Sequence, residues 1–155
     1  MTAAGPPPAD LVRELLERMV EALGLEATVE VETDGETVTG TLHGDDLGLF
    51  IGRHGQTIEA VQHLASRMTI QHAQGEPRRI VIDAEGYRAR REEALHRQAD
   101  QAADDALRFS RPVALDAMTA SERKLVHEYL RDRADVQTYS EGDEPDRHLV
   151  VAPLT

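Results

Sequence analysis

The chain has 155 residues, a size that suits one or two small domains, and 40% of its residues are hydrophobic. This apolar content is enough for a packed core and excludes a chain that is disordered throughout. The absence of cysteine excludes disulfides and thiolate nucleophiles and fits a reducing cytoplasm, while the net charge of −12 argues at first against nucleic-acid binding.

The first element that the sequence predicts is an amphipathic helix. Residues 1–9 are rich in Ala, Gly and Pro and lack the cationic and apolar segments of a signal peptide, so we expect a flexible leader. From Leu11 to Leu23 apolar side chains recur at helical spacing. Asp10 is placed to cap the start of this helix and Gly24 to end it.

A hairpin is predicted next, around Asp34-Gly35, a pair typical of two-residue turns. The flanking segments alternate between apolar and polar side chains. They are residues 28–33 and 37–42. With this turn Val31 would lie opposite Val38, and the apolar side chains would share one face.

The remaining elements of the first half alternate between helix and strand. They are a brief helix over 45–50, a Gly52-x-x-Gly55 loop, a helix from Ile58 to between His72 and Gly75, a loop closed by Pro77 and a strand over 79–84. The resulting order is helix, strand, strand, helix, GxxG, helix, strand.

The second half begins with a long polar helical segment and ends with two strands joined by an acidic loop. The predicted elements are a helix from Tyr87 to about Phe109, a strand over 111–116, a helix to about Leu130, strands over 136–139 and 148–152, and the loop 141–146 between them. Thr119 is the expected N-cap of the shorter helix. Glu122 follows three positions later, which makes a capping box.

The loop between Ile51 and Ile58 carries the chemistry of a phosphate-binding turn. Two glycines remove the Cβ atoms that would hold a sugar-phosphate chain away, and the loop opens directly into a helix N-terminus that favours anions. Arg53 adds a charge-assisted hydrogen bond and His54 a further donor. The I-G-x-x-G-x-x-I pattern resembles the signature of KH domains, whose GxxG loop clamps about four nucleotides. The order of elements matches the type II KH topology, α-β-β-α-α-β.

From this resemblance we expect seven residues of the loop to bind RNA. They are Ile51, Gly52, Arg53, His54, Gly55, Gln56 and Ile58. Ile51 and Ile58 would floor a groove for the bases. The aromatic residues are scattered along the chain, so we expect no aromatic stacking platform of the RRM kind.

The charge distribution supports a site in this part of the chain. Residues 1–46 carry 11 acidic and 2 basic side chains, and residues 98–155 carry 12 acidic and 7 basic ones. Residues 47–97 carry 8 basic and 6 acidic side chains. RNA would therefore be held by a local patch, with modest affinity and strong salt dependence.

A second motif lies in the shorter helix of the second half. Arg123 and His127 are four positions apart and share a helix face. The segments 116–127 and 139–147 around them resemble the small nucleic-acid-binding domain named for an Arg and a His separated by three residues, the RxxxH domain. This resemblance implies that Arg123 and His127 face single-stranded nucleic acid, with Lys124 and Arg147 extending the contact.

The tandem order resembles the Jag/KhpB (SpoIIIJ-associated) family, in which a KH domain directly precedes an RxxxH domain. The expected fold class is α/β, of the α+β kind, with a leader over 1–9, a KH domain over 10–85 and an RxxxH domain over 86–155. The resemblance implies a bacterial cytoplasmic protein that binds single-stranded RNA, or single-stranded DNA, and is linked to cell elongation and division as a post-transcriptional regulator or RNA chaperone. It also implies a small KH-only partner protein or a homodimer. Many members carry a further N-terminal domain, for which this chain has only about nine residues before the KH-like part.

The sequence predicts no catalysis, no cofactor, no metal site and no small-molecule substrate. The seven histidines form no HExxH pattern, and the chain has no P-loop or dinucleotide fingerprint. It also has no apolar segment of about 20 residues for membrane insertion. Two alternatives stay open: a protein-interaction adaptor that uses the KH fold for docking, and a binder of structured RNA or DNA. Dependence on Gly55 is expected to separate RNA binding from the adaptor, which need not avoid a Cβ atom there.

Overall fold

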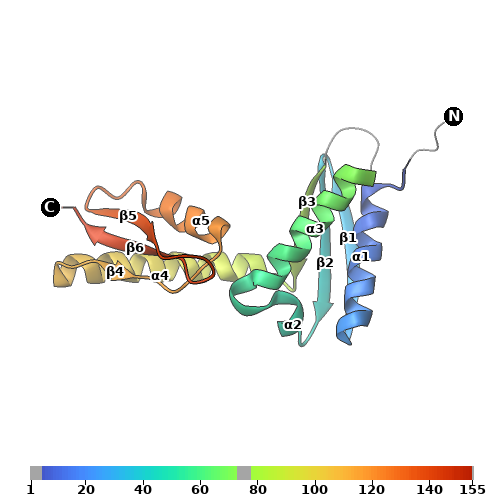
Figure 1. The fold of residues 1–155 in the computed structure, drawn as a ribbon, viewed down its shortest axis with the longest axis horizontal. Helices are drawn as coiled ribbons and strands as arrows, with labels where there is room; N and C mark the ends of the chain where they lie inside the picture. The colour runs from blue at the N-terminus through green and yellow to red at the C-terminus, as the bar shows by residue number, and fades with distance from the viewer. Residues whose placement is uncertain (1–4, 73–77, 155) are drawn as a thin grey trace. The chain divides into compact units, whose positions relative to one another are not determined.

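The computed structural model describes residues 5–72 and 78–154, which form two compact units. One unit ends at Tyr87 and the other begins at Arg88 (Figure 1). Each unit is described by itself. The predicted loop end at Gly75 and Pro77 lies outside the described residues.

The first unit places two long helices against a mixed sheet. Its elements are α1 (Pro8–Leu23), β1 (Ala27–Asp34), β2 (Thr37–Gly44), α2 (Gly48–Ile51), the 3₁₀ turn η1 (Arg53–Gly55), α3 (Gln56–His72) and β3 (Arg79–Ala84). The strand order is β1-β2-β3, with β2 antiparallel to β1 and parallel to β3. Figure 1 shows α1 and α3 side by side against these strands. This arrangement confirms the α-β-β-α-α-β order of the type II KH topology.

The core of this unit lies between the helices and one face of the sheet. Alternate residues of β2 and β3 are buried there, whereas their neighbours in sequence are partly exposed. Fully buried side chains come from every layer: Leu16, Leu42, Phe50, Ile58 and Ile82. Phe50 and Ile58 lie on either side of the glycine loop, so the loop is anchored to the core at both ends.

The start of α1 differs from the prediction. The helix begins at Pro8, with Pro7 at the N-cap and no side-chain capping bond, so Asp10 lies inside the first turn. Proline suits the first helical position because its missing N–H has no partner there in any case. Asp10 still interacts favourably with the positive end of the helix dipole. Gly24 ends the helix in a left-handed conformation, as predicted.

The hairpin forms with a register two residues away from the predicted one. Val31 lies opposite Gly40 instead of Val38, because the two turn residues are Gly35 and Glu36. Gly35 has φ +57° and is the first central residue of the turn, a position where positive φ favours glycine. A shift of two residues leaves every side chain on its predicted face, since strand side chains alternate with a period of two.

The second unit packs two helices with an antiparallel sheet. Its elements are α4 (Tyr87–Phe109), β4 (Val113–Ala114), α5 (Ala120–Leu130), β5 (Val136–Glu141) and β6 (His148–Pro153). The strand order is β4-β6-β5, which puts the most buried strand, β6, in the middle. The helices meet the strands in one apolar cluster that includes Leu95, Ala99, Val126, Leu130 and Val151.

The strand predicted over 111–116 is much shorter than expected. Its ladder comprises only Val113 and Ala114, paired with Val151 and Val150. Pro112 has no N–H to donate, which limits the ladder on that side. On the other side the chain leaves regular pairing, and isolated backbone bonds continue, such as the one from the Leu115 N–H to the Leu149 carbonyl.

The start of α5 joins that helix to α4. The Thr119 side chain accepts a hydrogen bond from the Glu122 backbone N–H, as the predicted capping box requires. The Glu122 carboxylate is turned toward α4 instead of completing the box. It accepts two hydrogen bonds from Arg91 of α4, at 3.0 and 3.2 Å. A paired carboxylate–guanidinium contact of this kind fixes geometry as well as adding energy.

Gly40 is the point of closest approach between α1 and the first sheet. A Cβ atom there would lie 2.6 Å from both Leu16 Cδ1 and Val12 Cγ1. Replacing Gly40 by Val should therefore overpack the interface and lower the free energy of unfolding by about 1–3 kcal/mol. Urea denaturation measures this loss.

Thr41→Val is the matched control for that substitution, because Thr41 is the next residue in β2 and lies on the opposite face of the sheet. It should change stability by less than about 0.5 kcal/mol. Equal effects of the two substitutions would show that Gly40 has no special role in packing.

Candidate nucleic-acid interface

The glycine loop owes its shape to left-handed backbone angles. Gly52 has φ +76°, His54 has φ +56° and Gly55 has φ +74°. The Gly52 N–H donates to the Gly48 carbonyl at 2.8 Å, and the Gly55 N–H to the Gly52 carbonyl at 3.2 Å. These bends bring the end of α2 directly to the start of α3 at Gln56. The free N–H groups of a helix N-terminus are thereby placed beside the loop.

The two glycines face the protein itself. A Cβ atom on Gly52 would collide with the Thr57 side chain, and one on Gly55 would lie 2.6 Å from Tyr87 Oη. Gly55 is also buried. The expectation that these positions lack Cβ atoms to admit a sugar-phosphate chain is therefore wrong in direction. For the same reason, sensitivity to substitution at Gly55 cannot separate RNA binding from an adaptor role.

The side chains of the loop divide into exposed polar groups and apolar anchors. Arg53 and Gln56 are exposed and His54 is half-buried. In the part of the chain that the structure describes, neither Arg53 nor His54 has a side-chain partner. Ile51 is half-buried. Ile58 is 0% exposed, so it cannot floor a groove for bases as expected and instead anchors α3 in the core.

The second motif surrounds an open hollow of about 460 Å³ in the second unit. Its lining comes from α5, β5 and the start of β6. The lining residues are Ala120, Arg123, Lys124, His127, Thr138, Tyr139, Ser140, Arg147 and Leu149. The structure thus brings together all four residues that the sequence singled out in this half: Arg123, Lys124, His127 and Arg147.

These four basic residues differ in how available they are. Lys124 and His127 are exposed, and the His127 ring Nδ1 is hydrogen-bonded to Thr138 Oγ1. Arg147 is half-buried and donates to the Gly142 carbonyl at 2.7 Å. Arg123 is only 8% exposed. Its Nη1 donates to the Met118 carbonyl at 2.5 Å and its Nη2 to Glu144 Oε1 at 2.6 Å.

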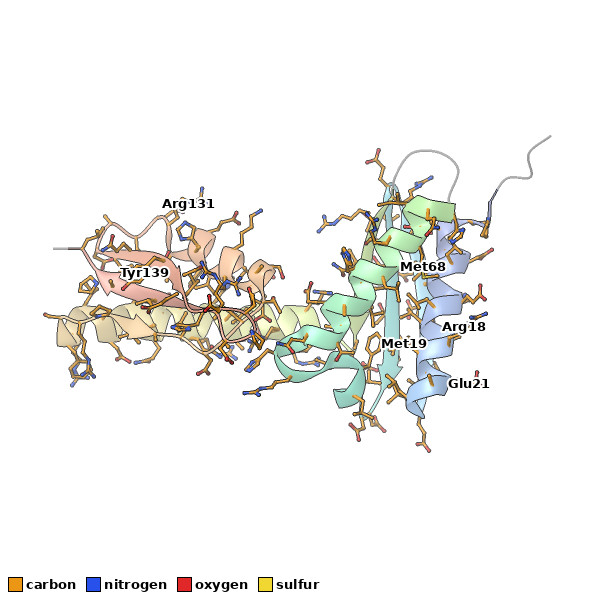
Figure 2. All side chains as sticks on the ribbon, in the orientation of Figure 1. Arg18, Met19, Glu21, Met68, Arg131 and Tyr139 are labelled. Atoms are coloured by element: carbon orange, nitrogen blue, oxygen red, sulfur yellow. The ribbon has the colours of Figure 1, made fainter. Side chains whose placement is uncertain are left out.

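Sequence reasoning missed three residues of this hollow, all on β5: Thr138, Tyr139 and Ser140. Val136 is buried, and the alternation along β5 places Thr138 and Ser140 on the same side as Val136. That period-two pattern was visible in the sequence and could have identified them. Tyr139 is 45% exposed and lies on the sheet of the second unit (Figure 2). No sequence signal marked it, because the aromatic residues are scattered along the chain.

A different charge pattern marks the polar face of the first sheet. The hydrogen bond from Glu30, with a smaller contribution from Glu85, raises the pKa of His43. The same bond to His43 lowers the pKa of Glu30, and the hydrogen bond to Glu30 raises the pKa of Glu32. Carboxylates dominate this face, so it would repel phosphate. The glycine loop is the better candidate for an anion contact in this unit.

The described residues offer neither a metal-binding cluster nor a membrane span. Over residues 5–72 and 78–154, no group of three or more His, Cys, Asp or Glu side chains is arranged to hold a metal ion. Among the described helices, none combines the length and apolar character needed to cross a bilayer.

Comparison with known proteins matches both halves to families. The KhpA/KhpB KH domain matches residues 9–82, and the RxxxH domain matches residues 93–153. RNA-binding protein KhpB of Clostridium symbiosum is 34% identical over 92% of this chain. RNA-binding protein KhpB of Bacillus subtilis is 32% identical over 94%, and that of Lactiplantibacillus plantarum 37% over 86%. The aligned regions span 65%, 70% and 41% of those three relatives, so the first and third extend well beyond this chain.

The contact between Gly55 and Tyr87 can be tested by a double-mutant cycle. Gly55→Ala should lower the free energy of unfolding by about 1–3 kcal/mol, because of the clash and the positive φ. In a Tyr87→Phe background the cost should be smaller, since the atom nearest to the new Cβ is gone. Urea denaturation of the four proteins gives the coupling energy. An equal cost in both backgrounds would contradict the contact.

Proposed function

The chain belongs to the KhpB family of proteins that combine a KH and an RxxxH domain, and from that premise we propose that it binds single-stranded RNA without catalysing a reaction. The observation that carries the proposal is the glycine loop. Arg53 and His54, which have no side-chain partner among the described residues, stand at the N-terminus of a helix that is anchored in the core. The relatives named above are themselves called RNA-binding proteins.

In the proposed mechanism the loop holds the backbone of the RNA. The Arg53 guanidinium donates to phosphate oxygens, and His54 and Gln56 add donors beside it. The first-turn N–H groups and the dipole of α3 favour the same negative charge. The bases lie along the exposed side of α3, where Leu64 is 47% exposed and offers apolar contact. Ile51 contributes through its exposed part, and the buried Ile58 only by holding the helix.

The hollow in the second unit extends the footprint. Lys124 and His127 are its most accessible basic groups, and Arg147 lies at its edge. Tyr139 supplies an exposed aromatic ring, on which a base can stack for about 1–3 kcal/mol. Phosphates and a base would then meet complementary groups within one hollow. Because both grips act on backbone and stacking, the proposal predicts little base preference, and single-stranded DNA would compete.

The biological role follows the family. We propose a regulator or chaperone of RNA linked to cell elongation and division, acting with a small KH-only protein or as a homodimer. An adaptor that docks proteins is the second candidate. It is favoured by the net charge of −12 and by exposed apolar side chains such as Leu49 and Ile70, which are 66% and 61% exposed. Such an adaptor would not depend on the cations of the loop.

Arg53→Asp combined with His54→Asp should remove most of the RNA binding, at least about tenfold in Kd, because charge-assisted contacts become repulsive. Fluorescence anisotropy with a short random single-stranded RNA pool, across salt concentrations, measures this. The logarithm of the wild-type binding constant should fall with the logarithm of salt concentration, with a slope of about −0.7 per phosphate contact.

Arg18→Asp combined with His72→Asp is the control, since it makes the same charge change in the same unit. Arg18 points away from α1 (Figure 2), and His72 ends α3 at the far end from the loop. It should bind RNA more tightly than the loop variant. Equal loss in both variants, or no binding by the wild type, would favour the adaptor.

Lys124→Ala combined with His127→Ala tests the hollow. The double variant should bind the same RNA about three- to tenfold more weakly and show a shallower salt dependence, because at least one phosphate contact is lost. Arg131→Ala, an exposed charge in the same unit outside the hollow lining, should change the affinity much less. If the two variants bind alike, the RxxxH half makes no contact with RNA.

A further inference from the structure

The most buried basic group of the hollow is already bound to an anion of the protein. Arg123 lines the hollow, yet its Nη2 donates to Glu144 Oε1 at 2.6 Å. Its Nη1 is held by the Met118 carbonyl. The guanidinium is therefore fixed in place by α5 and by the backbone before it, while the group facing it is a carboxylate from another segment.

Glu144 belongs to the acidic loop that joins β5 to β6. Residues 141–146 carry four carboxylates: Glu141, Asp143, Glu144 and Asp146. The loop is tied down by an Arg147 bond to the Gly142 carbonyl and by a backbone bond from Asp146 to Asp143. Among these carboxylates, within the described residues, Glu144 is the one that pairs with Arg123.

The two partners of this ion pair differ strongly in exposure. The side chain of Arg123 is 10% exposed, whereas that of Glu144 is 61% exposed. Glu144 can therefore leave the pair and become hydrated at little cost, whereas Arg123 would be left as a buried charge without its partner. An incoming oxyanion removes that penalty. A phosphate is such an oxyanion and accepts from guanidinium as a carboxylate does.

We propose that Glu144 is an internal competitor for phosphate at Arg123, so that RNA enters the hollow by exchanging with the Glu144 carboxylate. The inference rests on the proposed RNA binding and assigns a control to the same site. In the free protein Glu144 keeps the buried guanidinium paired and places the acidic loop beside the hollow. On binding, the phosphate takes over the guanidinium and the carboxylate moves into water. The loop thus selects for ligands that present an oxyanion at Arg123.

The test compares two neutralising substitutions in the same loop. Glu144→Gln and Asp143→Asn each remove one negative charge, so their long-range effect on a polyanion is matched. Only Glu144→Gln removes the competitor. The full chain with Glu144→Gln should bind single-stranded RNA about two- to fivefold more tightly than the chain with Asp143→Asn. Fluorescence anisotropy at one salt concentration gives the two Kd values.

Glu144→Asp is the second variant, and it changes no charge. The side chain is one methylene shorter and pairs less well with Arg123, so RNA should bind more tightly than to the wild type. This variant keeps the test decisive if Glu144→Gln unfolds, which circular dichroism would reveal.

The outcomes separate the two proposals. Equal affinities of Glu144→Gln and Asp143→Asn, or weaker binding by Glu144→Gln and Glu144→Asp than by the wild type, overturn the competitor while leaving RNA binding in place. If neither the wild type nor any variant binds RNA, the proposed function itself fails. Tighter binding by Glu144→Gln and by Glu144→Asp supports the exchange.

Discussion

The left-handed backbone at Gly52, His54 and Gly55 is the constraint on which the first half of the molecule depends. These angles turn the chain from α2 into α3 within four residues. The two glycines adopt them without strain, whereas a residue with a Cβ atom, such as His54, does so at a cost of about 1–2 kcal/mol. Phe50 and Ile58 offset that strain because they are fully buried on either side. The loop is therefore a rigid part of the core that ends in exposed polar side chains.

Charge is the second constraint, since a chain of net charge −12 has few cations to offer. Several arginines are engaged within the protein: Arg91 with Glu122, Arg133 with Asp135 and Arg123 with Glu144. The hydrogen bond from Arg133 lowers the pKa of Asp135, which keeps that pair charged. Arg53 and Lys124 have no such partner among the described residues. At physiological salt, charges more than about 8 Å away are largely screened, so local cations can attract phosphate on an acidic protein.

Local periodicity predicted most of the fold, and contacts between distant segments account for what it missed. The long helix from Tyr87 to Phe109 and the strand Arg79–Ala84 match the structure because their patterns repeat over many residues. The hairpin kept its faces but not its register, since the turn is centred one residue later than Asp34-Gly35 suggests. In the candidate site, the sequence identified the residues better than their roles. The burial of Arg123 depends on Glu144, which is 21 residues away, and the packing of Gly55 depends on Tyr87, which is 32 residues away.

The two halves present their cations in different ways, and this difference bears on the kind of nucleic acid that fits. Arg53 and His54 need no rearrangement to meet a phosphate, whereas Arg123 is held by a carboxylate. Both sites are small and are flanked by acidic segments. A duplex is stiff and carries one charge per roughly 1.7 Å of its axis, so it would bring many phosphates near carboxylates for each one it places on a cation. A single strand is flexible and can bend a few phosphates onto the loop while the rest stays in solvent. The acidic surface would therefore act as a filter that favours single strands, and the net charge that argued against nucleic-acid binding becomes a source of selectivity.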